Sequence, residues 1–596
     1  MHIVEPEFQT EAGRPIKSVT LEQVLNKMSS AVTHTSVVES PLVALHVLVG
    51  VLAQCDLVYS VPAFVALCLL TSWMKTFWIF KSAKTQYGGP KVPPYWPYTV
   101  PSIGPVVTTL SFAMSRDPGP DMVKAVFKNS WTCTMAALHR FVLGNVFGMS
   151  GEALRLYDLD KSGYRHKPVA GTAIEPRNRI DYLTYGPMIK FLSGPGMKAF
   201  WNRYETHLTQ KLQHLPVGAG WTEMPDLTRV FEVEVSAANT DALCGPYLLQ
   251  RHPDFLEELW KLDCHLDCFF RSTPRIFAPR VYARRDRLLA CVKDWRSHAQ
   301  LNFRGDSVDE NGDDPFWGSR VFRERHGLFS EMDHMDSDAM ASEDFGVIWA
   351  STRNSVVASL WAVLEIISDS EILRNVRREV AKCRDSSPTG LNITLLLESP
   401  LLQSIYAEVL RLRVHMLIIR VPIFDNLHVK DWMVPRGDVL LMSTTVAHMD
   451  PAVWNTGENG QHPLDTFWAE RFLKYDGVPG SGPRRTASNE AGSSCPARSV
   501  GGGPPACPAP RGNVSYGIKD VDGAWIPYGG GQRQCPGRHF AKRDIIYTAA
   551  VMVTYFDIEP LVDVDSLKMD MRGFGLGTMA VKGAIPFRIR RREILS

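Results

Sequence analysis

The sequence predicts a mainly α-helical protein with a smaller β region. Residues 401–413 are strongly helical in pattern, and residues 345–367 form an almost wholly apolar helical run that five polar residues interrupt. Short strands are predicted near 427–441 and 580–589. Hydrophobic residues make up 45% of the 596 positions, which is enough for a sizeable core. One large unit is therefore expected over most of the chain.

The first hundred residues predict a membrane anchor. Residues 1–56 form a polar lead that ends in a short apolar segment, and 57–80 is an apolar run long enough to span a bilayer. Lysines follow this run, which predicts that the downstream chain lies in the cytosol. The proline-rich stretch 81–105 is predicted to be a stiff connector to a domain at 106–596. Whether 41–53 forms a second span stays open.

Two segments within the predicted domain have the composition of loops. Residues 304–343 are rich in Asp and Glu with several glycines, and 477–513 is rich in Gly, Pro and Ser. Neither segment has enough apolar side chains to support its own core. The second is predicted to be a disordered insertion.

Charge and cysteine usage narrow the class of protein. The formal net charge of +2 does not suggest a nucleic-acid partner. Eleven cysteines at scattered spacing favour a reducing compartment over a disulfide framework. Cys264 and Cys268 share one predicted helix face, but the sequence offers no second pair of ligands that would complete a zinc site. A packed pair of core cysteines is therefore favoured over a zinc site.

The most informative segment is a glycine-rich loop around one cysteine. From Gly529 to Gly531 the backbone can lie close against a flat ligand, since no side chain stands off it. Arg533 offers a fork of donors to a carboxylate. Pro536 lacks an N–H group, so the next two amides are placed to hydrogen-bond the sulfur of Cys535, and the helix that follows favours a thiolate. A thiolate beside a carboxylate-binding arginine suits axial ligation of haem iron.

This loop resembles the signature of the cytochrome P450 haem-thiolate family, Phe-x-x-Gly-x-Arg-x-Cys-x-Gly, with tyrosine in place of phenylalanine. The resemblance implies a cytochrome P450-like fold with an N-terminal membrane anchor helix. It also implies haem b as cofactor, with its iron bound by the Cys535 thiolate. The other loop residues that the resemblance places at the cofactor are Tyr528, Gly529, Gly531, Arg533 and Gly537.

Two further motifs carry the same resemblance. Glu408 and Arg411 lie three residues apart on one helix face, and Arg471 stands in a segment similar to the family's Pro-Glu-Arg-Phe. The resemblance implies that these three form a buried structural cluster beneath the haem. Between these motifs, Arg420 ends an apolar stretch and is implied as a second propionate partner. A short buried strand that ends in a surface arginine is the alternative. Residues 574–579 resemble the turn that dips toward substrate.

The distal helix departs from the family pattern Ala-Gly-x-Asp/Glu-Thr-Thr. Here the sequence from Ala350 reads Ala-Ser-Thr-Arg-Asn-Ser, so Arg353 replaces the acid and Asn354 replaces the alcohol. The acid and the alcohol of the family's common proton relay are therefore missing from this sequence. Asn354 and Ser355, supported by Ser351 and Thr352, are predicted to hold a water chain, because amide and hydroxyl groups both donate and accept. A polar kink in a core helix is the alternative.

This version of the distal helix resembles the branch of the sterol 7α-hydroxylases and, more distantly, prostacyclin synthase. With the resemblance to fungal tailoring enzymes, it implies a membrane-bound monooxygenase that inserts one atom of O2 into a lipophilic sterol, terpenoid or other specialised metabolite. An NADPH-cytochrome reductase is the implied electron donor. A haem-thiolate isomerase or dehydratase is the alternative, and an inert membrane haem protein is the third interpretation.

The implied location is the endoplasmic reticulum, as a single-pass membrane protein with its catalytic domain in the cytosol. The reductase is expected to dock on the cysteine side, where Arg538, Lys542 and Arg543 form a basic patch. A solvated helix face is the alternative interpretation of that patch.

Overall fold

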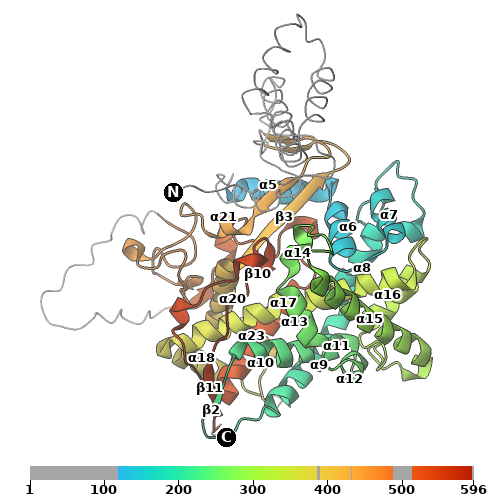
Figure 1. The fold of residues 1–596 in the computed structure, drawn as a ribbon. Helices are drawn as coiled ribbons and strands as arrows, with labels where there is room; N and C mark the ends of the chain where they lie inside the picture. Colours follow the sequence, from blue (N-terminus) through green and yellow to red (C-terminus); the bar gives the residue numbers. More distant parts are fainter. Residues whose placement is uncertain (1–118, 386–389, 431, 487–512, 594–596) are drawn as a thin grey trace, which may run out of the picture. The chain divides into compact units, whose positions relative to one another are not determined.

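The computed structural model describes residues 119–385, 390–430, 432–486 and 513–593, and these are mainly helical with several small sheets (Figure 1). The predicted fold class is confirmed in this respect. The predicted segments 1–56, 57–80 and 81–105 lie outside the described residues, as does most of the predicted insertion at 477–513.

Eighteen α-helices form the bulk of the described chain. In chain order they are α5 (Pro120–Asn129), α6 (Ala136–Asn145), α7 (Gly151–Leu159), α8 (Ile180–Ser193), α9 (Pro195–Gln213), α10 (Leu227–Val230), α11 (Ser236–Cys244), α12 (Tyr247–Arg251), α13 (Phe255–Asp263), α14 (Leu266–Phe270), α15 (Pro279–Asn302), α16 (Arg320–Ser330), α17 (Ser337–Ser368), α18 (Ser370–Ala381), α19 (Ile393–Glu398), α20 (Pro400–Arg413), α21 (Thr444–His448) and α23 (Arg538–Tyr555).

The strands are short and form four small sheets in the described part of the chain. They are β1 (Cys133–Thr134), β2 (Thr222–Met224), β3 (Val414–Pro422), β4 (Leu427–Val429), β5 (Trp432–Val434), β6 (Leu440–Ser443), β7 (Leu473–Tyr475), β8 (Val514–Tyr516), β9 (Phe556–Pro560), β10 (Leu576–Thr578) and β11 (Phe587–Arg591). The predicted strands near 427–441 and 580–589 correspond to β4–β6 and β11.

The long helix α17 organises the core. Its 32 residues begin at the N-cap Asp336, whose carboxylate accepts a hydrogen bond from the amide of Ala339 at 2.8 Å. The helix packs against α11, α15, α20 and α23, so most of its surface is buried. A helix that is covered on all sides has no need of a polar stripe, which explains the nearly continuous apolar sequence that predicted it.

Strand β3 is the centre of the sheet that borders α17. It pairs antiparallel with β1, β6 and β10, and its register sets Val414 opposite Thr578 and Met416 opposite Leu576. This pairing joins the apolar stretch before Arg420 to the 574–579 turn, and β10 in turn contacts α17.

The loop predicted over 304–343 is wrong in its second half. Helix α16 occupies Arg320–Ser330, and Val321, Phe322 and Phe329 are fully buried. The charged residues that suggested a loop are paired inside the protein: Arg325 bonds Asp344 at 3.0 Å and Glu343 at 3.2 Å. Composition shows that charged residues are present, but it does not reveal which side chains pair with them in the folded protein.

The predicted packed pair of core cysteines is also wrong. Cys264 is exposed and Cys268 is half-buried, because the chain turns after α13 and the short α14 does not continue the same helix face.

The predicted localisation requires a correction. In the described ranges, no helix is long and apolar enough to cross a membrane. The longest helix, α17, carries Asp344, Arg353 and Glu365, each paired with an oppositely charged side chain of another helix. These charges belong to a packed protein interior, and the single-pass location in the endoplasmic reticulum is not retained.

The predicted Glu-Arg-Arg cluster is confirmed. The Glu408 carboxylate accepts hydrogen bonds from Arg411 Nε at 2.7 Å, from Arg411 Nη2 at 2.8 Å and from Arg471 Nε at 2.9 Å. All three side chains are fully buried. The two guanidiniums hold the pKa of Glu408 below its ordinary value although burial acts to raise it. The cluster ties α20 to the segment before β7.

We expect Glu408→Gln to lower the free energy of unfolding by about 3–5 kcal/mol, since it leaves two buried guanidiniums without a full counter-charge. Glu379→Gln is the matched control, because Glu379 pairs with Lys382 at the surface and such pairs contribute about 0–1 kcal/mol. Chemical denaturation of the purified variants measures both. Equal losses in the two variants would contradict a structural role for the cluster.

Candidate active site

The cysteine loop has the compact backbone that its glycines predict. Gly529 and Gly531 have φ values of 65° and 67°, a region that side chains rarely occupy. The amide of Cys535 donates to the carbonyl of Tyr528 at 3.0 Å and closes the loop. The Tyr528 hydroxyl accepts a hydrogen bond from Tyr406 at 3.0 Å, which fixes the aromatic ring at the start of the loop.

Gly530 is required for a different reason. A Cβ atom at this position would collide with the ring of Phe127 in α5. The loop therefore lies directly against α5, and the close approach of the two segments depends on the missing side chain.

Cys535 stands just before α23; the residue is exposed as a whole, but many protein atoms surround its thiol. Burial raises the pKa of the Cys535 thiol, while hydrogen bonds from the amides of Gly537 and Arg538 and the Arg538 charge oppose that rise. The two predicted amide contacts are thus present, but burial outweighs them. Metal coordination removes the proton of such a thiol, because the thiolate is the form that binds.

Arg533 is a buried guanidinium that is only partly satisfied. Its Nη2 donates to the carboxylate of Asp181 in α8. Its Cζ atom lies 4.0 Å from the ring centroid of Tyr164 and 5.5 Å from that of Tyr185. Its Nε and Nη1 have no hydrogen-bond partner among the described residues. Two donors of one buried cation are therefore free to receive an anion.

Arg420 is a second guanidinium of the same kind. It is 1% exposed, donates from Nη2 to the carbonyl of Gly530 at 3.1 Å, and has a buried Nε without a partner in the described chain. Burial lowers the pKa of Arg420, and the charge of Arg533 lowers it further. The arginine is buried, so the alternative of a strand ending in a surface arginine is wrong.

Together these two arginines fit the carboxylates of haem. Two buried cations with three free guanidinium nitrogens are balanced in the protein by one carboxylate, that of Asp181. A dianionic ligand would supply the missing charge and acceptors. The donor set of Cys535, Arg420 and Arg533 is thus the one that haem requires.

The four predicted distal residues do not converge on one relay. Ser351 and Thr352 each donate to the backbone carbonyl of Ile348, at 2.9 and 3.0 Å. Ser355 is buried on the side of α23, where its hydroxyl contributes a hydrogen bond to Asp544. Asn354 is half-buried, and its Oδ1 accepts a hydrogen bond from the amide of Thr578 in β10 at 2.9 Å. The structure therefore separates these side chains among three environments.

Asp544 was not identified by the sequence reasoning. It is fully buried in α23 and accepts hydrogen bonds from Tyr204 and from Thr548, the latter at 3.1 Å. Burial raises its pKa, and the hydroxyls of Ser355, Tyr204 and Thr548 oppose the rise. A charged residue within an apolar helix was the available signal. Asp181 and Asp263, the partners of Arg533 and Arg353, were missed because they lie far away in sequence.

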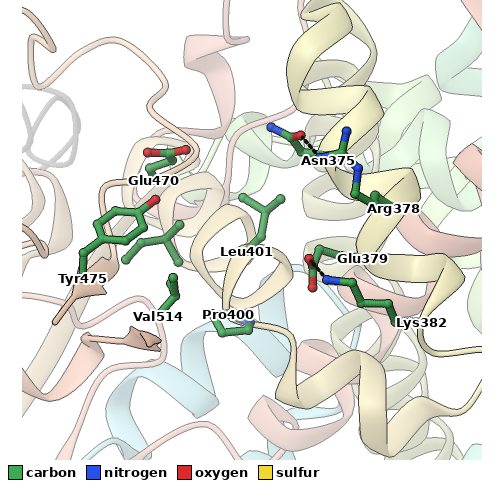
Figure 2. Close-up of a pocket in the computed structure, with 10 residues that line it drawn as sticks. Asn375, Arg378, Glu379, Lys382, Pro400, Leu401, Glu470, Tyr475 and Val514 are labelled. Atoms are coloured by element: carbon green, nitrogen blue, oxygen red, sulfur yellow. Dashed lines mark hydrogen bonds and ion pairs between the residues drawn. The ribbon is translucent and has the colours of Figure 1, made fainter. Parts of the chain in front are cut away.

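A surface groove of about 360 Å³ lies away from these residues (Figure 2). It runs between α18, α20 and the β7–β8 pair, and its charged lining residues, which include Arg378, Glu379, Lys382 and Glu470, are of both signs. None of the predicted cofactor or distal residues borders it.

Comparison with known proteins agrees with the geometry. The profile of the cytochrome P450 family matches residues 320–587. The chain is 31% identical to the cytochrome P450 monooxygenase efuG of Hormonema carpetanum, over 90% of this chain and 96% of that protein. It is 34% identical to the cytochrome P450 monooxygenase fsoE of Humicola fuscoatra, over 71% and 72% of the two chains. It is 29% identical to the 5-beta-cholestane-3-alpha,7-alpha-diol 12-alpha-hydroxylase of Sus scrofa, over 45% and 50%.

The chain belongs to the cytochrome P450 family and is a haem-dependent oxidoreductase. Members of this family bind haem through a cysteine thiolate.

We expect Gly530→Ala to lower both the haem content and the stability of the purified protein. The added methyl group forces the ring of Phe127 to move, and overpacking of this kind costs about 1–3 kcal/mol. The absorbance ratio of haem to protein and a thermal unfolding curve measure the two effects. Gly327→Ala is the control, since Gly327 lies in α16 and an added Cβ there would meet no atom within 4 Å. Failure of Phe127→Ala to restore haem content in the Gly530→Ala background would contradict the steric explanation.

Proposed function

We propose that the protein is a haem-thiolate monooxygenase that inserts one atom of O2 into a lipophilic substrate. The observation that carries the proposal is the loop from Tyr528 to Gly537, in which an exposed cysteine stands beside the buried, partly unpaired Arg533. The relatives named monooxygenases and hydroxylases support this reaction class.

Each residue of the loop has a defined part in this proposal. Cys535 holds the iron, Arg533 and Arg420 bind the two propionates, and the backbone from Gly529 to Gly531 lies against the ring. When bound, the haem supplies the oxygen chemistry, and its thiolate ligand favours cleavage of the O–O bond. The protein supplies the position, the exclusion of water and the charge balance.

The proposed substrate region lies between α17, β3 and β10. Strand β3 contributes three half-buried apolar residues, Met416, Leu417 and Ile419, of which Leu417 and Ile419 share one face. We propose a sterol, a terpenoid or another specialised metabolite as the substrate. The 12α-hydroxylase that acts, by its name, on a cholestane diol supports a polycyclic substrate.

The proposed electron donor is an NADPH-dependent reductase that docks on the face of Arg538 and Arg543. No salt bridge joins either arginine to a described carboxylate, and their hydrogen bonds go to the carbonyls of Cys535 and His539. Lys542, the third member of the predicted patch, donates instead to Gln403 at 2.7 Å. The basic patch is thus reduced to Arg538 and Arg543, which lie close to the cysteine loop. Two cations at this position suit an acidic surface on the partner.

An isomerase or dehydratase is the second candidate, because Arg353 occupies the position of the usual acid. A reaction of this class needs neither O2 nor reductase. Dependence on these two reactants separates the candidates.

The first test of the proposal is spectroscopic. We expect the reduced protein with carbon monoxide to show the strongly red-shifted Soret band of thiolate ligation, and Cys535→Ala to lose it, because no other sulfur replaces the ligand. Cys264→Ala is the control, since Cys264 is also an exposed cysteine. A red-shifted band that persists in Cys535→Ala would contradict the assignment of Cys535 as the iron ligand.

The second test concerns the reaction. With reductase, NADPH and ¹⁸O-labelled O2, we expect converted metabolites to gain one labelled oxygen atom and to disappear when NADPH is withheld. Mass spectrometry of products from a sterol and terpenoid library measures this. Conversion without NADPH and without label would instead establish the isomerase or dehydratase.

A further inference from the structure

Arg353 is a charged residue buried in the middle of α17, and its charge is compensated by a different helix. Its side chain is 4% exposed, and its Nε lies 3.2 Å from both carboxylate oxygens of Asp263 at the end of α13. The Asp263 side chain is 8% exposed, and its carboxylate also accepts a hydrogen bond from Trp349 Nε1 at 2.8 Å. An ion pair this far from solvent persists when its remaining hydrogen bonds are also made.

The other end of the Arg353 guanidinium reaches β10 and the neighbouring Asn354. Its Nη1 donates to the carbonyl of Thr578 at 2.6 Å and to Asn354 Oδ1 at 3.1 Å. The amide of Thr578 donates to the same Asn354 oxygen at 2.9 Å. One planar fork thus joins α13, α17 and β10.

These contacts determine which way the Asn354 amide faces. A guanidinium and a backbone N–H group are donors only, so the atom between them must be the amide oxygen. The oxygen accepts two hydrogen bonds and is fully used. Among the described residues, no acceptor is bonded to the Asn354 nitrogen. That nitrogen is left as a donor without a partner among the described residues.

Gly577 allows β10 to lie close to this amide. Its φ value is 142°, and a Cβ atom there would collide with Asn354 Oδ1. The close approach of β10 to α17 therefore depends on the missing side chain of Gly577, and the two hydrogen bonds to Oδ1 hold the amide in its orientation.

Asn354 lies on the same face of α17 as the neighbouring residues that are exposed or half-buried. Ala350 is exposed, and Val347 and Ser351 are half-buried, whereas Thr352, Arg353 and Ser355 are buried. Residues spaced by three, four and seven lie on one helix face. In the middle of α17, this is the face that the described side chains cover least.

We propose that Arg353, held by Asp263, is a positioning residue that fixes the Asn354 amide with its NH2 group toward a ligand on the open face of α17. The inference rests on the proposed function, which places the substrate between α17, β3 and β10, and it takes the open face of α17 to border that region. It replaces the predicted water chain through four side chains with one fixed donor to an oxygen atom of a bound ligand or water. An amide donates a hydrogen bond but releases no proton, so any proton must come through bound water.

The test uses the C–O stretching band of the carbon monoxide complex of the reduced full-length protein. A hydrogen bond to the bound ligand lowers this frequency. We expect one narrow band in the wild type, a shift to higher frequency in Asn354→Leu, and a shifted or split band in Asp263→Leu/Arg353→Leu, where the amide is released. Replacing both charges avoids leaving one buried ion alone.

Two further variants keep the test decisive if the double variant folds poorly. Arg353→Lys keeps a positive charge near Asp263 but has no planar fork to reach Thr578 and Asn354 together, so we expect normal stability and a shifted or split band. Glu365→Gln is the matched control, because Glu365 forms another largely buried ion pair of α17, with Arg413 at 2.6 Å. It should leave the band unchanged.

Three results would overturn the inference. An unshifted band in Asn354→Leu would mean that the amide does not face the ligand. A wild-type band in both Arg353 variants, together with a shift in Asn354→Leu, would reduce the ion pair to a structural contact. A wild-type protein without the thiolate type of carbon monoxide complex would overturn the proposed function and this inference together, which distinguishes that failure from the first two.

Discussion

The arrangement of the active site depends on a balance of buried charge. Arg420 and Arg533 bring two positive charges into a site where the protein places one carboxylate, that of Asp181. Isolated buried ions are strongly unfavourable, and unpaired guanidinium donors add to that penalty. We propose that a ligand with two carboxylates balances this charge, with Cys535 as the ligand of its metal.

The same principle operates throughout the interior. Glu408 is surrounded by two arginines, Asp344 is bonded by Arg325, and Asp263 is bonded by Arg353. In each case at least one partner comes from a different element, so the ion pairs also fix one element against another. The helices thus acquire defined positions as well as apolar contacts, and the position of α17 relative to β10 is the one on which the distal site depends.

Local patterns predicted the parts of the site that are encoded locally. The loop around Cys535, the helix that follows it and the Glu408 motif each occupy a few consecutive residues, and the structure agrees with them. The failures involve contacts that composition and motif alignment do not reveal. The segment 304–343 was predicted to be a loop because it is rich in Asp and Glu with several glycines, yet helix α16 forms there around buried Val321, Phe322 and Phe329. Arg353 was identified only as the replacement of the usual acid, because its partner Asp263 lies 90 residues away in the sequence. Pairing across helices is a property of the folded chain.

The central claim is that the buried arginines are built for the two carboxylates of haem. Equilibrium binding of haem and of haem dimethyl ester to the haem-free protein tests it most directly, because the ester keeps the ring and the iron and removes both negative charges. The account predicts that the ester binds at least about tenfold more weakly, since a charge-assisted hydrogen bond contributes about 1.5–3 kcal/mol. It also predicts that Arg420→Gln weakens the binding of haem while barely changing that of the ester. Equal affinities of the wild type for haem and its ester would contradict the account.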